Sequence, residues 1–376
     1  MNAVVESVKP LYILGRIFGF FPFKFSENGD VKLSIFGFLH AIGIFLILDF
    51  ILYLRLIHKD NYKQQGSVVS QFTFFCAILF CVCFAVVLIL INFIQRKKFK
   101  KALKSISKFD AKVKFLFFCN INYKKQSQRA VFMFISNALT YTLVTLIPWY
   151  CYAILIGAET EEIFTTTLLH LMWYGILFYT VICILAIEII YNRFKIFNEI
   201  LSKVKEKEMI RNVAVLYLLL CHTLTIFNQI YSPLIALFFG CCLLCGTFVF
   251  YELFDIVYYS HENGGEFKMK IFVTFIIVMM NFQFVNLNCI FINISSKTMR
   301  EGKKGDKILC ESFCISKPNL LTCKRVLLFN LQLQHKEPEI TCGMFKFDWS
   351  IIHNFFAATL SYLVIMIQFT QNRKSN

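Results

Sequence analysis

The sequence predicts an all-α membrane protein with seven transmembrane helices and additional helical segments in the cytosol. Two observations lead to this fold class. Of the 376 residues, 57% are hydrophobic, and the mean hydropathy is +0.62. Long apolar stretches recur along the chain, separated by polar and charged intervals. A single soluble core cannot bury this many apolar side chains, of which 45 are Phe, so we expect most of them to lie in a bilayer.

Each apolar stretch is long enough to cross a membrane. A spanning helix needs about 20 mostly apolar residues, and seven stretches reach this length within one domain that covers residues 1–376. They are residues 32–54, 68–94, 131–157, 166–190, 229–258, 270–294 and 350–371. The longer intervals at 95–130, 191–228 and 295–349 are then expected to form helical extensions on one side of the membrane.

The distribution of Lys and Arg sets the expected orientation, because short loops rich in these residues stay in the cytosol. Segment 95–130 carries a dense run of Lys and Arg against one acid, Asp110, and segment 191–228 is also basic. In the loop at 158–165, all of the charged residues are acidic. The loop after the first span, with Arg55, is the one opposing signal. We therefore expect the N-terminus inside the cell, the C-terminus outside, and a multi-pass protein of the plasma membrane.

The cytosolic segments have their own helical pattern. Five apolar residues recur every three or four positions opposite a row of Lys: Phe99, Leu103, Ile106, Phe109 and Val113. The apolar face of this helix, at 96–114, either lies on anionic inner-leaflet lipid or packs into a cytosolic bundle. Segment Arg211–Asn228 would form the core of that bundle, with His222 as a packed residue.

Motifs that carry enzymatic chemistry are not present in the sequence. There is no phosphate-binding loop, nucleophile elbow or zinc-protease helix. The Cys241, Cys242 and Cys245 run mimics a metal spacing, yet it lies within a predicted span and is interpreted as packing. We predict no catalytic residue, no metal, no cofactor and no nucleic-acid partner, so the function is sought in binding and permeation.

Polar and aromatic residues gather in the predicted outer halves of three spans, where polar groups are costly and therefore informative. These residues could line an outward-opening ligand pocket. They are Trp149, Tyr152, His170, Trp173, Glu252 and Asp255. The alternative is an interfacial aromatic belt whose acids reach toward water.

Four amides crowd the sixth predicted span, where an amide that faces lipid would be penalised. They are Asn281, Gln283, Asn286 and Asn288. We expect all four to face protein or water, either in hydrogen bonds between helices or as the lining of a vestibule.

The last span ends in a distinctive pattern. Tyr362, Ile365 and Phe369 lie on one helical stripe at i, i+3 and i+7, with Gln368 beside it. The run from Ser361 to Phe369 resembles the C-terminal signature of the insect gustatory receptor family, which reads Thr-Tyr, five hydrophobic residues and Gln-Phe. Ser361 stands in place of the Thr. The segment 10–22 is similar to the hydrophobic N-terminal motif of the same family.

The resemblance implies a tetrameric cation channel whose last helix lines a central pore. Carried onto this sequence, the stripe from Tyr362 faces the pore, Phe369 and Gln368 form the gate, and Ile365 lies just below it. Apolar rings of this kind gate by dewetting. The family also implies a ligand site in the outer half of each subunit and a cytosolic bundle where subunits meet, which favours the bundle over lipid for helix 96–114.

The sequence therefore predicts a gustatory receptor, a ligand-gated non-selective cation channel for contact chemosensation in chemosensory neurons. Its expected partners are a small-molecule tastant, permeating cations, membrane lipid and related subunits in a homo- or heterotetramer. Sugar-sensing members commonly carry Glu after the motif Tyr, where this chain has Leu363, so we expect a bitter or other non-sugar tastant. The alternatives are a metabotropic seven-helix receptor and, because of Glu252 and Asp255, a small-solute transporter.

Overall fold

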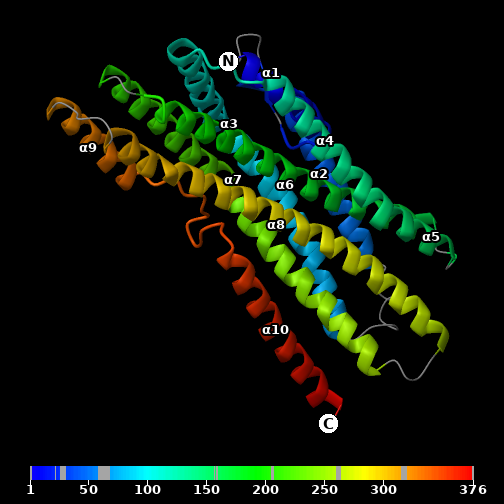
Figure 1. Cartoon of the computed structure of the whole chain (residues 1–376). Helices are drawn as coiled ribbons and strands as arrows, with labels where there is room; N and C mark the ends of the chain where they lie inside the picture. Colours follow the sequence, from blue (N-terminus) through cyan, green and yellow to red (C-terminus); the bar gives the residue numbers. More distant parts are fainter. Residues whose placement is uncertain are drawn as a thin grey trace.

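The computed structural model of this protein describes residues 2–21, 23–25, 31–57, 68–155, 157, 160–204, 207–259, 264–314 and 320–374. Helices form nearly all of it, which confirms the predicted all-α class (Figure 1). The α-helices are α1 Asn2–Ile17, α2 Ile35–Ile57, α3 Val68–Phe117, α4 Tyr123–Tyr141, α5 Ile147–Leu155, α6 Thr160–Leu201, α7 Lys207–Tyr259, α8 Gly264–Cys314, α9 Leu320–His335 and α10 Ser350–Lys374. A π-helical turn, η2 Thr142–Leu146, joins α4 to α5, and strands β1 Phe23–Phe25 and β2 Val31–Leu33 form a small antiparallel pair.

Each stretch predicted to span a membrane lies largely in helical residues, although residues 32–33 belong to β2 and the third stretch runs through α4, η2 and α5. The residues with described side chains contain five segments long and apolar enough to cross a bilayer: Tyr123–Leu155, Trp173–Leu201, Met209–Tyr251, Thr274–Glu311 and Ser350–Gln368. Helix α2 and the first part of α3 carry the first two predicted spans, and many of their side chains lie outside the described part. The protein is thus a multi-pass membrane protein, while seven spans and their orientation stay predictions.

Four helices are much longer than a membrane requires. Helices α3, α6, α7 and α8 contain 50, 42, 53 and 51 residues. At 1.5 Å per residue they measure about 60–80 Å, against about 30 Å for the hydrocarbon core. These lengths agree with the predicted helical extensions. In Figure 1, α1, α9 and the basic end of α3 lie at one end of the molecule, and the ends of α5, α7 and α10 lie toward the other.

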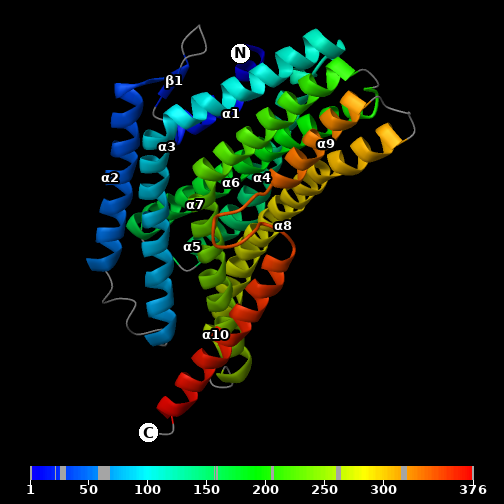
Figure 2. The ribbon, with the colours of Figure 1, turned by 90° about the vertical axis from the view of Figure 1, so that its left-hand side faces the viewer.

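Helix α6 forms the centre of the core. Every residue from 175 to 185 is buried, and farther along the helix Phe194 and Phe197 have no exposed surface. Aromatic side chains from other elements pack around it, including Phe18 and Phe20 from the segment after α1, whose rings lie 5.4 and 6.0 Å from Phe178. A helix apolar on all sides belongs in the interior of a bundle, which explains its central position in Figure 2.

The basic helix at 96–114 is the second half of α3, and its apolar face packs inside the protein along α7. Leu103, Ile106, Phe109 and Val113 are buried, and the hydroxyl of Ser105 donates to the carbonyl of Leu219 at 3.2 Å. The apolar face of this helix therefore packs in the helical bundle and not on lipid.

A buried ion pair ties this extension to two other helices. Arg193 of α6 has no exposed surface and donates through Nε and Nη2 to the Asp110 carboxylate of α3, at 3.2 and 3.0 Å. The Tyr123 hydroxyl of α4 donates to the same carboxylate at 2.7 Å. Two-point Arg–carboxylate pairs are strong and geometrically specific, so this network fixes how α3, α4 and α6 meet.

Candidate functional site

Three of the predicted pocket residues lie together in one aromatic cluster at the end of the bundle. The ring centroid of Trp149 lies 5.6 Å from that of Tyr152 and 5.8 Å from that of His170. Tyr152 stacks on Phe272 of α8 at 5.8 Å. The cluster thus joins α5, α6 and α8, as a pocket between helices requires.

Tyr141 completes this cluster, although sequence reasoning did not select it. Its hydroxyl oxygen lies 2.9 Å from Nδ1 of His170 and 3.1 Å from the His170 carbonyl oxygen. Both side chains are buried. The pairing holds the imidazole edge in a fixed orientation beside the indole of Trp149.

The π-helical turn η2 positions Trp149. Pro148 follows it and has no N–H to close a regular helical bond, and a local widening of the helix accommodates this. Such π turns are frequent at functional sites. Within the described residues, the indole Nε1 of Trp149 and the hydroxyl of Thr145 are buried without a hydrogen-bond partner. Buried polar atoms are normally paired, so these two are candidates for contact with a bound molecule or water.

The remaining predicted pocket residues lie elsewhere or outside the described part. Trp173, one turn after His170, packs edge-to-face on Phe284 of α8 with ring centroids 5.2 Å apart. Glu252 and Asp255 belong to the last turns of α7, toward the same end of the molecule as α5 (Figure 1), and their side chains lie outside the described residues. Their part in a pocket stays a prediction.

The amides of α8 behave largely as expected. Asn281, Gln283 and Asn288 are buried, whereas Asn286 is exposed in the single chain. Gln283 Nε2 donates to the Asn137 side chain of α4 at 2.9 Å, and Asn288 Nδ2 lies 3.1 Å from the Cys242 sulfur of α7. Hydrogen bonds between helices are thus the role of two of them, and Asn281 instead donates to its own helix at the Ile277 carbonyl.

Helix α10, which carries the predicted pore stripe, is the most exposed of the five candidate spans found among the described residues. It packs chiefly against α7 and points away from the rest of the bundle (Figure 2). Tyr362 and Ile365 are 54% and 46% exposed, and Gln368 is exposed as well. The Phe369 side chain lies outside the described residues. An apolar helix with this much free surface must meet lipid or another chain.

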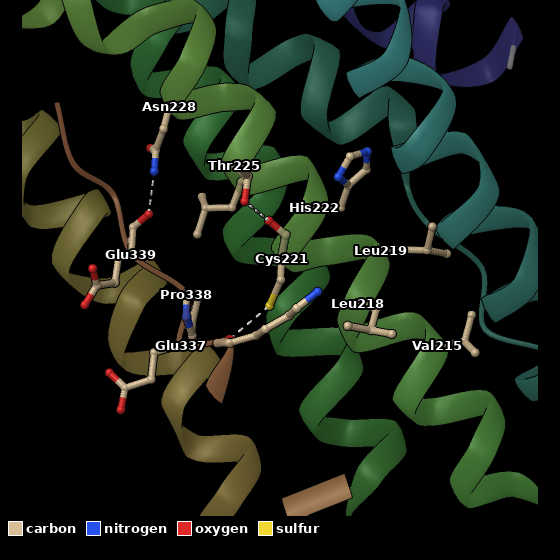
Figure 3. A pocket seen from close by; sticks show the side chains of 12 residues that line it. Val215, Leu218, Leu219, Cys221, His222, Thr225, Asn228, Glu337, Pro338 and Glu339 are labelled. Carbon is tan, nitrogen blue, oxygen red and sulfur yellow. Dashed lines mark hydrogen bonds between the residues drawn. The ribbon is translucent and has the colours of Figure 1, made fainter. Parts of the chain in front are cut away.

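A groove runs along α7 in the predicted cytosolic part (Figure 3). Its volume is about 690 Å³, and the segment 336–339 forms the opposite wall. His222 lines it with an exposed side chain and is therefore not the packed core residue that the Leu-rich sequence predicted. The helical turn around His222 is apolar in composition, and the sequence does not reveal which face the bundle leaves open.

The wall of this groove is attached to α7 by hydrogen bonds. The hydroxyl of Tyr217 donates to the Lys336 carbonyl at 2.8 Å, and Asn228 Nδ2 donates to the Glu339 carbonyl at 2.7 Å. Ser232 donates to the Thr341 carbonyl. These bonds link the segment that precedes α10 to a long stretch of α7.

An ion pair between Glu339 and Lys346 joins the two sides of the turn that precedes α10. The Glu339 carboxylate, through its hydrogen bond and its charge, raises the pKa of Lys346. A backbone bridge between Thr341 and Lys346 brackets Gly343, whose φ of +88° suits glycine. The turn therefore gives α10 a defined starting point.

Helices longer than a membrane requires, a peripheral apolar helix and an aromatic cluster at one end define a multi-pass helical membrane protein with a candidate ligand site. The chain belongs to the 7tm chemosensory receptor family, whose model matches residues 8–373. This confirms the resemblance to the insect chemosensory receptors and the prediction that the chain is not an enzyme.

Solved structures of an insect olfactory receptor share this fold. The insect olfactory receptor OR5 from Machilis hrabei is similar with a TM-score of 0.66 at 12% identity, over 97% of this chain and 98% of that chain. The same receptor in complex with eugenol gives a TM-score of 0.62 at 13% identity, with the same shares covered. No curated protein sequence matches the chain. At these identities the likeness establishes the fold of the present chain.

Proposed function

We propose that this protein is a gustatory receptor that acts as a ligand-gated, non-selective cation channel in the plasma membrane of chemosensory neurons. It assembles as a homo- or heterotetramer with seven spans, the N-terminus inside and the C-terminus outside. The observation that carries this proposal is α10, an apolar helix whose stripe of Tyr362 and Ile365 is exposed in the single chain. Around a symmetry axis the stripe forms stacked apolar rings, which lipid contact alone would not require.

Helix α7 supplies a mechanical route from ligand to pore. Its far end carries Glu252 and Asp255, and its middle is hydrogen-bonded to the segment before α10. Phe347 of that segment packs on Phe239 of α7 and Phe291 of α8, with ring centroids 5.7 and 5.2 Å apart. A ligand that shifts α7 therefore moves the base of α10, and near-complete switching requires several kcal/mol of preference for the open state.

The ligand site of this proposal is the cluster around Trp149, Tyr152 and His170, with Trp173, Glu252 and Asp255 at its margins. The relative described above was solved with eugenol, and for the present chain we propose a small tastant with an aromatic or apolar body and a hydrogen-bond acceptor. Leu363 after the motif Tyr favours a bitter or other non-sugar compound.

Trp149→Phe tests this site, because Phe keeps an aromatic ring but lacks the unpaired indole N–H together with the five-membered ring that carries it. A ligand that accepts a hydrogen bond from Nε1 loses about 0.5–1.5 kcal/mol of affinity. The concentration for half-maximal current should rise by a few-fold to about tenfold, with the maximal current unchanged. Trp349→Phe is the matched control, since Trp349 is exposed at the start of α10. Equal dose-response curves for both variants would remove Trp149 from the ligand site.

Three experiments separate the channel from its rivals. Ligand-evoked currents in a heterologous cell should persist with a G-protein blocker present, and currents abolished by the blocker would identify a metabotropic receptor. An epitope tag at Met1 should be stained only after permeabilisation, because the basic segments 95–130 and 191–228 predict a cytosolic N-terminus. Accumulation of a solute against its gradient, lost when Glu252 and Asp255 are neutralised, would instead identify a transporter.

A further inference from the structure

A partly open apolar cavity lies at the other end of the molecule from the aromatic cluster, between α1, α3, α6 and α7. Its volume is about 80 Å³, and every residue that lines it is buried or half-buried. None of the lining residues is charged. Representative positions are Leu11 of α1, Ala102 of α3, Ala186 of α6 and Phe227 of α7. The cavity is separate from the proposed ligand site and from the groove along α7.

The chemistry of the lining selects an apolar occupant. The lining carries three hydroxyls, those of Tyr12, Thr223 and Tyr231, among otherwise apolar side chains. The Tyr12 hydroxyl donates to the Phe23 carbonyl at 2.6 Å, and the Thr223 hydroxyl donates to the Leu219 carbonyl at 2.7 Å. A water needs about 10–15 Å³ and two to four polar partners, so this cavity has the room but not the partners. Apolar cavities of about 150 Å³ stay dry and bind molecules such as benzene, so one about half that size suits a few carbons of a hydrocarbon.

The position of the cavity indicates where a hydrocarbon would come from. Its α3 wall begins at Phe99, directly after Arg96, Lys97 and Lys98, where α3 leaves the predicted span 68–94. Basic residues at this level attract anionic phospholipid headgroups. We propose that the cavity binds the end of a hydrocarbon chain, supplied by an inner-leaflet phospholipid, and that this occupant fills the space between α1 and the bundle.

Photolabelling of the full chain in nanodiscs tests the proposal. The nanodiscs contain phosphatidylserine whose acyl chain carries a diazirine near its end, and mass spectrometry locates the label. We expect label on α7 at Phe227 and Ile230, which are 3% and 2% exposed and thus out of reach of bulk lipid. Label on Phe132, which is 71% exposed on α4, serves as the internal reference.

Two Ala-to-Leu variants on α3, one in the cavity wall and one at an exposed position, show whether the label reaches α7 through the cavity. Ala102→Leu fills the space and should lose the label at Phe227 and Ile230 while keeping it at Phe132. Ala111→Leu adds the same side chain at an exposed position of α3 and should keep both labels. If Ala102→Leu does not fold, Ala186→Leu replaces it from the α6 wall.

Each labelling pattern either supports or overturns the proposed hydrocarbon site. Label confined to exposed positions, for both this phospholipid and a free diazirine-bearing short alkane, overturns the proposal. Label at Phe227 that survives both cavity-filling variants overturns it as well, because the probe then reaches α7 by another route. Label from the free alkane alone supports the hydrocarbon site and assigns it to a diffusible apolar molecule instead of a membrane lipid.

Discussion

Arg193→Met is expected to destabilise the protein by about 3–5 kcal/mol, because it leaves the buried Asp110 carboxylate without its charged partner. This is a large share of the about 5–15 kcal/mol that holds a typical protein folded. The exposed fraction is 0% for the Arg193 side chain and 5% for Asp110, so water cannot replace the lost guanidinium. We expect little protein at the cell surface and an early melting transition in detergent, measured by fluorescence-detected size exclusion after heating.

Two further variants define the cause of that loss. Lys195→Met removes an exposed cation two residues away and should change stability by no more than about 0.5 kcal/mol. The triple variant Asp110→Leu, Tyr123→Phe, Arg193→Met replaces the whole network with apolar groups and should recover much of the surface protein, since no buried charge remains. If Arg193→Met behaves like Lys195→Met, the ion pair does not stabilise the fold.

The helices could be predicted from the sequence because hydropathy is a local property. Each apolar stretch satisfies its own backbone hydrogen bonds as a helix, whatever its neighbours are. The amphipathic half of α3 was predictable for the same reason, from Phe99, Leu103 and Ile106 at helical spacing. Its packing against protein could be predicted only through the family resemblance, because the choice between lipid and protein depends on α7, more than one hundred residues away in the sequence.

The buried pair of Asp110 and Arg193 could not be predicted, because in the sequence both residues look like part of the charge pattern that sets membrane orientation. Asp110 reads as a lone acid in a basic segment, and Arg193 reads as one more cytosolic cation. Their pairing across 83 residues depends on how α3 and α6 pack. Tyr141 was missed for a related reason, since it lies in an uncharged run of apolar and Thr residues and gains its role only from His170 across the helix interface. The one local signal was Pro148, which marks the irregular turn that orients Trp149.

Replacing Phe369 with Ala should raise the ligand-free current if four copies form the apolar constriction of a pore. The smaller side chain widens the ring and lowers the dewetting barrier that keeps the closed pore dry. Whole-cell recording without ligand, normalised to surface protein, measures the effect. Phe356→Ala is the matched control, because Phe356 is exposed on the same helix and should leave the basal current unchanged.

Gln368→Glu is expected to change the ion selectivity of the same pore. A ring of four carboxylates beside the gate would attract cations, so reversal potentials in mixed Na⁺ and Ca²⁺ solutions should shift toward the divalent ion. A Phe369 that faces lipid would instead lose only about 1.5–3 kcal/mol of burial on truncation and leave conductance as it was. Normal surface expression with unchanged basal current and unchanged selectivity in both variants would therefore exclude α10 from the pore, whereas a change in either requires the end of α10 to face permeating ions.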